Sequence, residues 1–187
     1  MARVLVPLAP GFEEIEAVTV IDLLRRAGIE VVVAGLPGKV PIQGSRGVVV
    51  VPDVALDEVL EQDFDMVVLP GGGPGAEHLD QDPRIRALLR RMAERDRYTA
   101  AICAAPKVLA HAGVLKGHRA TSYPGVLEAI RPEGVELVER PVVVDGKVVT
   151  SRGPGTAMDF ALTLIELLAG RATRDRVEAA LQRPASS

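Results

Sequence analysis

The chain has 187 residues, with 22 basic and 25 acidic side chains and a formal net charge of −3. That length predicts one domain over residues 1–187, and the slightly acidic balance gives no indication of a nucleic-acid or membrane partner. Hydrophobic residues make up 48% and charged residues 25%, which is typical of a globular protein and not of a disordered one. The single cysteine excludes an internal disulfide and a metal site built from several thiolates.

The ends of the chain predict no targeting signal. Acidic residues follow the first apolar run at once, and no apolar run approaches the roughly 18 residues that a membrane helix needs. These features favour a cytoplasmic protein. Residues 184–187 are predicted to form a frayed tail.

Short apolar runs without polar alternation predict the strands of a mainly parallel sheet, because such strands are buried on both faces. The runs are Val4–Ala9, Val31–Leu36, Val48–Val51, Met66–Leu69 and Thr99–Cys103. The pair Asp145-Gly146, between Val142–Val144 and Lys147–Thr150, predicts an antiparallel hairpin. Proline restricts Pro41–Arg46 to an edge strand or a loop.

Helical patterns lie between several of these runs, at Glu14–Ala27, Pro83–Arg95, Pro106–Ala112, Thr156–Leu168 and Thr173–Leu181. In the first, Ile15, Val18 and Ile21 are interpreted as the apolar stripe, and Gly28 is predicted to end the helix. Asp82 is predicted to cap the second. Strands alternating with helices indicate a three-layer α/β sandwich, in which ligands bind outside the carboxyl ends of the strands.

Cys103 follows an apolar strand and precedes a helical pattern with Pro106 in its first turn. This places the thiol on a tight strand-to-helix turn, the geometry of a nucleophile elbow. Free N–H groups at the start of the helix are expected to favour the thiolate. The alternative is a buried cysteine that acts only as a small hydrophobic residue.

The glycine-rich segment Leu69–Gly75 follows another strand at the same end of the sheet. Its glycines are expected to present backbone N–H groups to a developing oxyanion. Gly71, Gly73 and Ala76 also fit the spacing of a dinucleotide-binding fingerprint. Pro74 interrupts that fingerprint and no acid ends the following strand, so this interpretation is weak.

A Cys-His-acid triad is poorly supported. The histidines are His78, His111 and His118; none adjoins Cys103, and His111 lies about 12 Å along the helix by its rise per residue. Carboxylates remain as proton carriers, and Glu16, one turn into its helix, is able to face the strand ends. Burial beside a thiolate would raise its pKa toward neutrality, which suits a proton donor or base.

Several ordered motifs together resemble the ThiJ/PfpI family, in the branch of the Parkinson-associated protein deglycase and bacterial ThiJ-like proteins. The resemblance runs collinearly from about residue 3 to 181. The motifs are Ala9-Pro-Gly-Phe-Glu-Glu-Ile-Glu16, Asp22-Leu-Leu-Arg-Arg-Ala-Gly28, Val33-Ala-Gly35, Ser45-Arg46, Val67-Val-Leu-Pro-Gly-Gly72, Ala100-Ala-Ile-Cys103-Ala and Thr150-Ser-Arg-Gly-Pro-Gly-Thr156.

The resemblance implies a flavodoxin-like sandwich that forms a homodimer and needs no metal or organic cofactor. It implies that Cys103 is the nucleophile and that Glu16 is the carboxyl group touching the sulfur. Further implied roles are backbone donors to an oxyanion at Gly71, Gly72 and Ala104, and dimer contacts at Glu13, Arg46 and Arg152.

Two positions depart from the family pattern. Tyr123 stands near the cysteine where the human branch has histidine, and a phenol with a reference pKa of about 10 is a poor base at neutral pH. Ala104 stands where peptidase-like members have histidine, so proteolysis is not expected. The fold is shared with amidotransferase-like glutaminases, but the late histidine that they use is missing here.

The first functional hypothesis is therefore a protein deglycase or glutathione-independent glyoxalase, a hydrolase or lyase. Cys103 would add to the aldehyde of methylglyoxal, of glyoxal or of an early adduct on an amine, and Glu16 would shuttle a proton within the hemithioacetal. The alternative is an oxidative-stress sensor or redox-regulated chaperone, in which oxidation of Cys103 is the signal.

Overall fold

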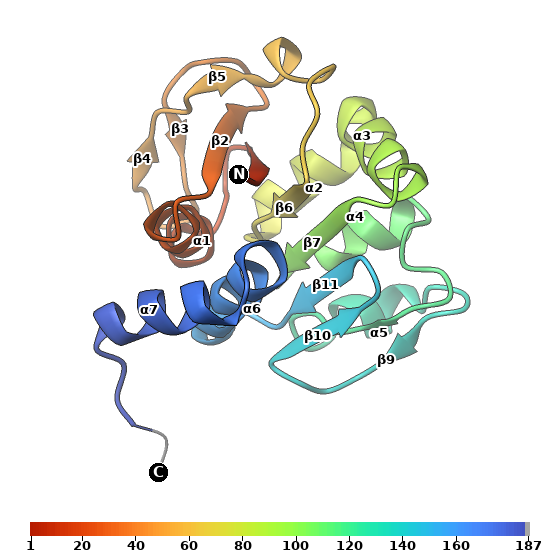
Figure 1. Ribbon diagram of the computed structural model, residues 1–187. Helices are drawn as coiled ribbons and strands as arrows, with labels where there is room; N and C mark the ends of the chain where they lie inside the picture. Colours follow the sequence, from red (N-terminus) through yellow and green to blue (C-terminus); the bar gives the residue numbers. More distant parts are fainter. Residues whose placement is uncertain (186–187) are drawn as a thin grey trace.

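The computed structural model describes residues 1–185. Its centre is a seven-stranded sheet of order β10-β11-β7-β6-β1-β2-β5 (Figure 1). The strands are β1 (Arg3–Leu8), β2 (Glu30–Gly35), β5 (Val54–Ala55), β6 (Met66–Leu69), β7 (Tyr98–Ile102), β10 (Val142–Asp145) and β11 (Val148–Ser151). All pairings are parallel except that of β10 with β11. The predicted parallel sheet with an antiparallel hairpin is confirmed.

Helices cover both faces of this sheet, as Figure 1 shows. One core lies beneath α1 (Glu14–Arg26), α6 (Ala157–Ala169) and α7 (Arg171–Leu181). The other lies beneath α2 (Gly73–Gln81), α3 (Pro83–Glu94), α4 (Pro106–His111) and α5 (Val126–Ile130). Neighbouring residues of β1 face opposite cores, with Val4 in the first and Leu5 in the second. Burial on both faces explains why these strands lack polar alternation.

The predicted helix ends are confirmed where a cap is present. Asp82 accepts a hydrogen bond from the backbone of Arg84 at 2.9 Å, and Pro83 occupies the first position of α3. Gly28, with φ of +78°, follows the end of α1. Both ends follow the capping preferences that the sequence shows.

The prediction of a buried parallel strand at Val48–Val51 is wrong. The segment contains β4 (Val49–Val50), which pairs antiparallel with β3 (Ile42–Gln43) in a hairpin outside the main sheet. The side of Val49 is open to solvent, with 57% of its surface exposed. An apolar run of four residues does not show which strand it pairs with. This run lies outside the main sheet, where it is not buried on both faces.

The apolar stripe assigned to α1 is wrong for Ile15 and Val18, whereas Ile21 packs against the core as predicted. Ile15 and Val18 are 55% and 44% exposed, whereas Val20 and Leu24 are buried against the sheet. The buried face of the helix also carries Glu16, so the residues on this face form a less apolar pattern in the sequence than a buried face usually does. Counting apolar residues therefore favoured the outer face.

A second small sheet lies beside α5 and was not predicted. It pairs β8 (Arg119–Ala120) with β9 (Glu136–Leu137) in parallel. Two short 3₁₀ turns, η1 (Leu56–Glu58) and η2 (Pro154–Thr156), complete the described elements. Strands of two residues carry too little periodicity to be recognised.

Within residues 1–185, none of the helices has the length and apolar character needed to cross a lipid bilayer. The single domain over residues 1–187 stays a prediction. Residues 186–187, the end of the tail predicted to be frayed, lie outside the described residues.

Candidate active site

Cys103 sits directly after β7, at the carboxyl edge of the sheet, on the turn that leads to α4. Its φ is +65°, a left-handed conformation that is uncommon for a residue with a side chain. Its N–H donates to the carbonyl of Ser151 at 3.0 Å, and its carbonyl accepts from the N–H of Tyr123 at 2.8 Å. The surrounding strands therefore hold a strained residue in place, as is common at functional sites.

Glu16 lies in the first turn of α1 and is completely buried. Its Oε1 accepts a hydrogen bond from the N–H of Gly71 at 2.9 Å. Its Oε2 is buried and has no hydrogen-bond partner among residues 1–185. The carboxyl group and the thiol of Cys103 are close enough for each to shift the pKa of the other. The structure thus brings together the two residues that the sequence analysis assigned to the chemistry.

Glycine is required where the loop after β6 passes between these two groups. A Cβ atom on Gly71 would lie 2.5 Å from Glu16 Oε1 and 2.6 Å from Cys103 Cβ. Gly72 has φ of +91°, and a Cβ there would lie 2.3 Å from the carbonyl oxygen of Gly11. The missing side chains allow the acid and the thiol to approach each other across the loop.

The backbone donors around the sulfur differ in part from the predicted set. The N–H groups of Gly72 and Ala104 point at the Cys103 sulfur and stabilise its charged form. The N–H of Gly71 is instead taken by Glu16 Oε1. This corrects the predicted role of Gly71, while oxyanion stabilisation by Gly72 and Ala104 stays a prediction.

Burial raises the pKa of Glu16 to about 7, and the nearby charge of Glu13 adds to this. Burial also raises the pKa of Cys103 to about 12, and the carboxylate of Glu16 adds to this. The expectation that the helix start favours the thiolate is wrong for the net effect. Backbone donors lower the pKa of Cys103, but desolvation and the adjacent acid raise it by more. The two groups titrate as a coupled pair that holds one proton above about pH 7.

Tyr123 reaches the site through its backbone and keeps an exposed ring. Its side chain is 51% exposed, and the ring lies beside Gly153, where an added Cβ would be 3.4 Å away. The three histidines have contacts elsewhere: His78 bonds to the carbonyl of Pro10, His111 bonds to Asp80, and His118 lies 3.7 Å from Asp145.

The three residues predicted at a dimer contact lie near the site in different ways. The carboxylate of Glu13 caps α1 by accepting from the N–H of Glu16 at 2.9 Å. Arg46 is exposed. Arg152 directs its guanidinium to Thr121 within the same chain, at 3.0 Å. Their role between two chains stays a prediction.

Sequence reasoning missed the role of Glu14. Its carboxylate is nearly buried and accepts from Ser45 Oγ at 3.0 Å and from the N–H groups of Arg46 and Val48 at 2.8 and 3.1 Å. These bonds lower the pKa of Glu14 and tie the β3–β4 hairpin to α1. The residues around Glu14 give no indication of these hydrogen bonds, because the partners lie more than 30 residues away in the sequence.

The fold and the site together define a flavodoxin-like α/β protein with a cysteine–carboxylate pair at the carboxyl edge of its sheet. Residues 2–167 match the sequence model described as "DJ-1/PfpI family", and the chain belongs to that family.

Named relatives agree over most of the chain. The "Parkinson disease protein 7 homolog" of Danio rerio is 43% identical over 181 residues, covering 96% of each chain. The "Glutathione-independent glyoxalase DJR-1.2" of Caenorhabditis elegans is 38% identical over 158 residues, covering 84% of this chain and 83% of the relative. The crystal structure of Drosophila melanogaster DJ-1beta superposes with a TM-score of 0.94 at 43% identity, covering 98% of this chain and 99% of that one.

Proposed function

We propose that this chain is an enzyme that converts reactive 2-oxoaldehydes, or their early adducts on amines, through a hemithioacetal on Cys103. The observation that carries the proposal is the contact between a buried carboxyl group with a pKa of about 7 and a thiol held on a strained turn. A proton carrier with a pKa near the working pH is effective in both directions. The name of the worm relative, a glutathione-independent glyoxalase, supports the same reaction class.

The first step forms a bond between the Cys103 sulfur and the aldehyde carbon of methylglyoxal. The electron pair of the C=O bond moves to oxygen, which would accept from the N–H groups of Gly72 and Ala104, the backbone donors that bond to the sulfur. The single proton held by Cys103 and Glu16 then passes to this oxygen and gives the hemithioacetal. The carboxylate of Glu16 is left without its proton.

The second step moves a proton between carbons. Glu16 removes the proton from the former aldehyde carbon, and the hydroxyl proton on that carbon's oxygen moves to the neighbouring oxygen through an enediol. Glu16 then returns its proton to the neighbouring carbon, which converts the hemithioacetal into a thioester of lactate. Water then attacks the thioester carbonyl and releases lactate, and the sulfur regains its proton. With an adduct on an amine, the thiol first displaces the amine, which leaves with the proton of Glu16.

The test is lactate formation from methylglyoxal by purified wild type, Cys103→Ala and Glu16→Gln. Cys103→Ala is expected to abolish it, and Glu16→Gln to lower kcat by about 10² to 10⁴, the usual contribution of a general acid–base group. Glu77→Gln, an exposed acid of α2 paired with Lys107, is the charge-matched control and is expected to keep full activity. Full activity in Cys103→Ala would remove the proposal.

A second candidate function is a redox sensor or redox-regulated chaperone. It is favoured by the partial exposure of Cys103, together with a carboxyl group that is protonated near neutral pH. Two equivalents of peroxide would convert the thiolate to a sulfinate with release of two waters, and the O–H of Glu16 would donate to it. Mass spectrometry after mild peroxide treatment tests this, because oxidation no faster than that of a free thiol would eliminate the idea.

We further propose that two copies of the chain form a homodimer. Exposed apolar residues on α1, the β3–β4 hairpin and the start of α6 support it: Ile15, Val18, Val49 and Met158. The elements that carry them are neighbours, because α1 packs on α6 and Glu14 ties the hairpin to α1. Such a cluster is more often an interface than a free surface.

A further inference from the structure

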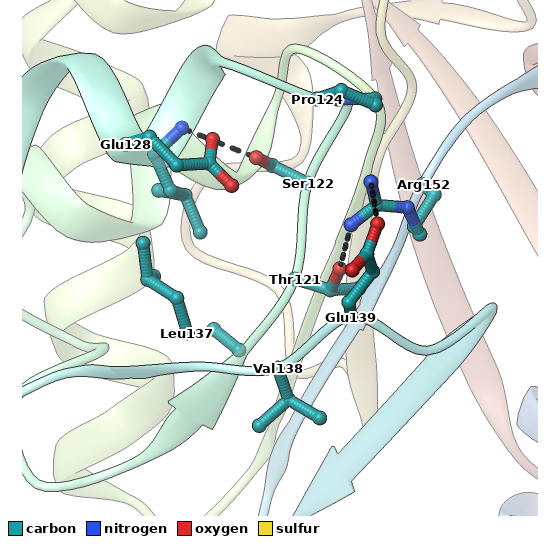
Figure 2. A pocket seen from close by; sticks show the side chains of 10 residues that line it. Thr121, Ser122, Pro124, Glu128, Leu137, Val138, Glu139 and Arg152 are labelled. Carbon is teal, nitrogen blue, oxygen red and sulfur yellow. Dashed lines mark hydrogen bonds and ion pairs between the residues drawn. The ribbon is translucent and has the colours of Figure 1, made fainter.

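A cavity of about 310 Å³ lies beside the candidate active site, between α5, the segment after β9 and the residue that follows β11 (Figure 2). Its apolar wall includes Leu127, Leu137 and Val138. The only cation among its lining residues is Arg152, and the acids are Glu128 and Glu139. The proposed reaction uses none of these side chains.

The guanidinium of Arg152 is held in position before any ligand arrives. Its Nη1 donates to Thr121 Oγ1 at 3.0 Å, and the N–H of Thr121 donates in turn to Thr150 Oγ1 at 2.9 Å. The side chain of Arg152 is only 20% exposed. A cation that is already fixed loses little further freedom when it binds an anion.

The acid that neutralises Arg152 is loosely held. Glu139 Oε1 lies 3.8 Å from Arg152 Nη2, and the Glu139 side chain is 90% exposed (Figure 2). An ion pair with one partner in solvent contributes little stability. A carboxylate that entered the cavity would therefore replace Glu139 at modest cost and form two parallel hydrogen bonds with the guanidinium.

Both chain segments that bear these groups also hold the backbone of Cys103. The carbonyl of Ser151, next to Arg152, accepts the Cys103 N–H at 3.0 Å. The N–H of Tyr123, two residues after Thr121, donates to the Cys103 carbonyl at 2.8 Å. Two backbone hydrogen bonds thus connect segments that line the cavity to the residue that carries the thiol.

We propose that this cavity is a binding subsite for short-chain monocarboxylates, with the anion on Arg152 and the carbon chain on Leu127 and Val138. A monoanion with an apolar end fits one fixed cation above an apolar wall. Glu128 at the rim disfavours a dianion such as phosphate. If the proposed function holds, the natural occupant is the 2-hydroxycarboxylate product of the reaction. The subsite would then allow the product to inhibit its own formation.

Occupancy is expected to reach Cys103 through the backbone and not through charge, because Arg152 is paired with an acid both before and after binding. The ligand contacts Arg152, next to Ser151, and the segment of Thr121, two residues before Tyr123, and both segments bond to the Cys103 backbone. A bound carboxylate therefore makes the surroundings of the thiol more rigid. Carboxylate binding is therefore expected to slow the reaction of Cys103 with a neutral alkylating reagent such as iodoacetamide.

Binding is measured by calorimetry with lactate, propionate and inorganic phosphate, on Cys103→Ser so that no turnover occurs. Lactate and propionate are expected to bind, and phosphate at least tenfold more weakly. Arg152→Gln is expected to weaken carboxylate binding at least tenfold, and Glu139→Gln to strengthen it about threefold. The nearby exposed residues outside the cavity supply charge-matched controls, Arg140→Gln and Glu136→Gln, which are expected to change nothing.

Equal binding by Arg152→Gln, equal binding of phosphate, or an unchanged affinity in Glu139→Gln would each overturn the subsite. Glu139 is exposed, so its variant gives an answer even if Arg152→Gln fails to fold. In the chain with Cys103 intact, lactate is expected to slow alkylation at least twofold. If lactate slows alkylation equally in Arg152→Gln, then lactate binds at Cys103 and not in the cavity. Failure of methylglyoxal turnover would remove the proposed function without changing any of these binding results.

Discussion

Glu16 is an acid that the fold keeps away from water, although no cation among residues 1–185 offsets its burial. Its partners are one backbone N–H and one thiol, which together stabilise the carboxylate less than water does. The folded chain therefore favours the protonated form. The reactivity of the site and its cost in stability have the same origin.

The stability of the protein is expected to depend on pH through this group. The folded-state pKa of about 7 lies above the ordinary value of 4.5, so the penalty is absent below about pH 4.5 and complete above about pH 7. Glu16→Gln removes the charge and keeps an acceptor for Gly71. Its free energy of unfolding relative to wild type is expected to rise by about 3 kcal/mol between pH 4 and pH 8.

Urea titrations of both proteins across that range measure this difference, and groups unrelated to residue 16 cancel in the subtraction. A difference between the two proteins that stays constant with pH would show that Glu16 ionises normally in the folded chain. The pair of Cys103 and Glu16 would then lack the shared proton that the proposed mechanism uses.

The gap at Gly71 is a second feature at the scale of single residues. Gly71→Ala is expected to push Glu16 away from Cys103 and to lower kcat for methylglyoxal at least 100-fold, because the added methyl would overlap both groups. Gly73→Ala, two residues along the same loop, is the control, since its Cβ meets nothing within 4 Å. Similar activities for the two variants would contradict the close approach of Gly71 to both Glu16 and Cys103.

The turn at Cys103 could be predicted from sequence because its signals are local: an apolar strand, small neighbours and a proline within four positions. The position of Glu16 against the sulfur could not, since it depends on where α1 lies relative to β7. The sequence alone showed that Glu16 is able to face the strand ends, and the family resemblance supplied its contact with the sulfur. The use of the Gly71 N–H by Glu16 was missed for the same reason, because a glycine motif shows that the backbone is free but not which group it binds.

At the scale of elements, a carboxylate holds the β3–β4 hairpin. Three hydrogen bonds from residues 45–48 converge on Glu14, and the hairpin lies outside the main sheet. Glu14→Gln removes the negative charge and one of the two acceptor oxygens, so a single neutral oxygen is left for the N–H groups of Arg46 and Val48 and their bonds become weaker. Hydrogen exchange at these two amides is expected to become at least tenfold faster.

Glu61→Gln, a charge-matched change at a side chain that is 96% exposed, is the control and is expected to leave exchange in the hairpin unaltered. Unchanged protection of both amides in Glu14→Gln would mean that the hairpin is held by its own two-residue ladder. The valines at Val48–Val51 would then be the stronger restraint.

Elements with a long pattern were predicted well, and those fixed by distant contacts were not. The strand at β7 and the helix at α3 follow from their own residues and caps. The hairpin at β3–β4 follows from Glu14, more than 30 residues away. Ile15 and Val18 point to solvent, although the apolar pattern predicted that they face the core. Contacts within one chain do not explain why these exposed positions are apolar.

At the scale of the whole molecule, that reversed face supports the homodimer. Wild type is expected to sediment with twice the mass of the chain. Val18→Glu places a charge within the apolar cluster and is expected to give a monomer, because an unpaired charge is costly at a dry interface. Val144→Glu, on the edge strand β10, is the matched control and is expected to remain dimeric. A monomeric wild type in sedimentation equilibrium would end this proposal.

The bond from Cys103 to Ser151 has a consequence for how the protein is made. A growing polypeptide contains the sulfur, the acid and the glycine loop once 103 of its 187 residues have been synthesised, but β11 comes later. Until that strand joins β7, nothing fixes the amide of the cysteine. The thiol of a nascent chain is therefore an ordinary one, and its chemistry begins only when translation is nearly complete.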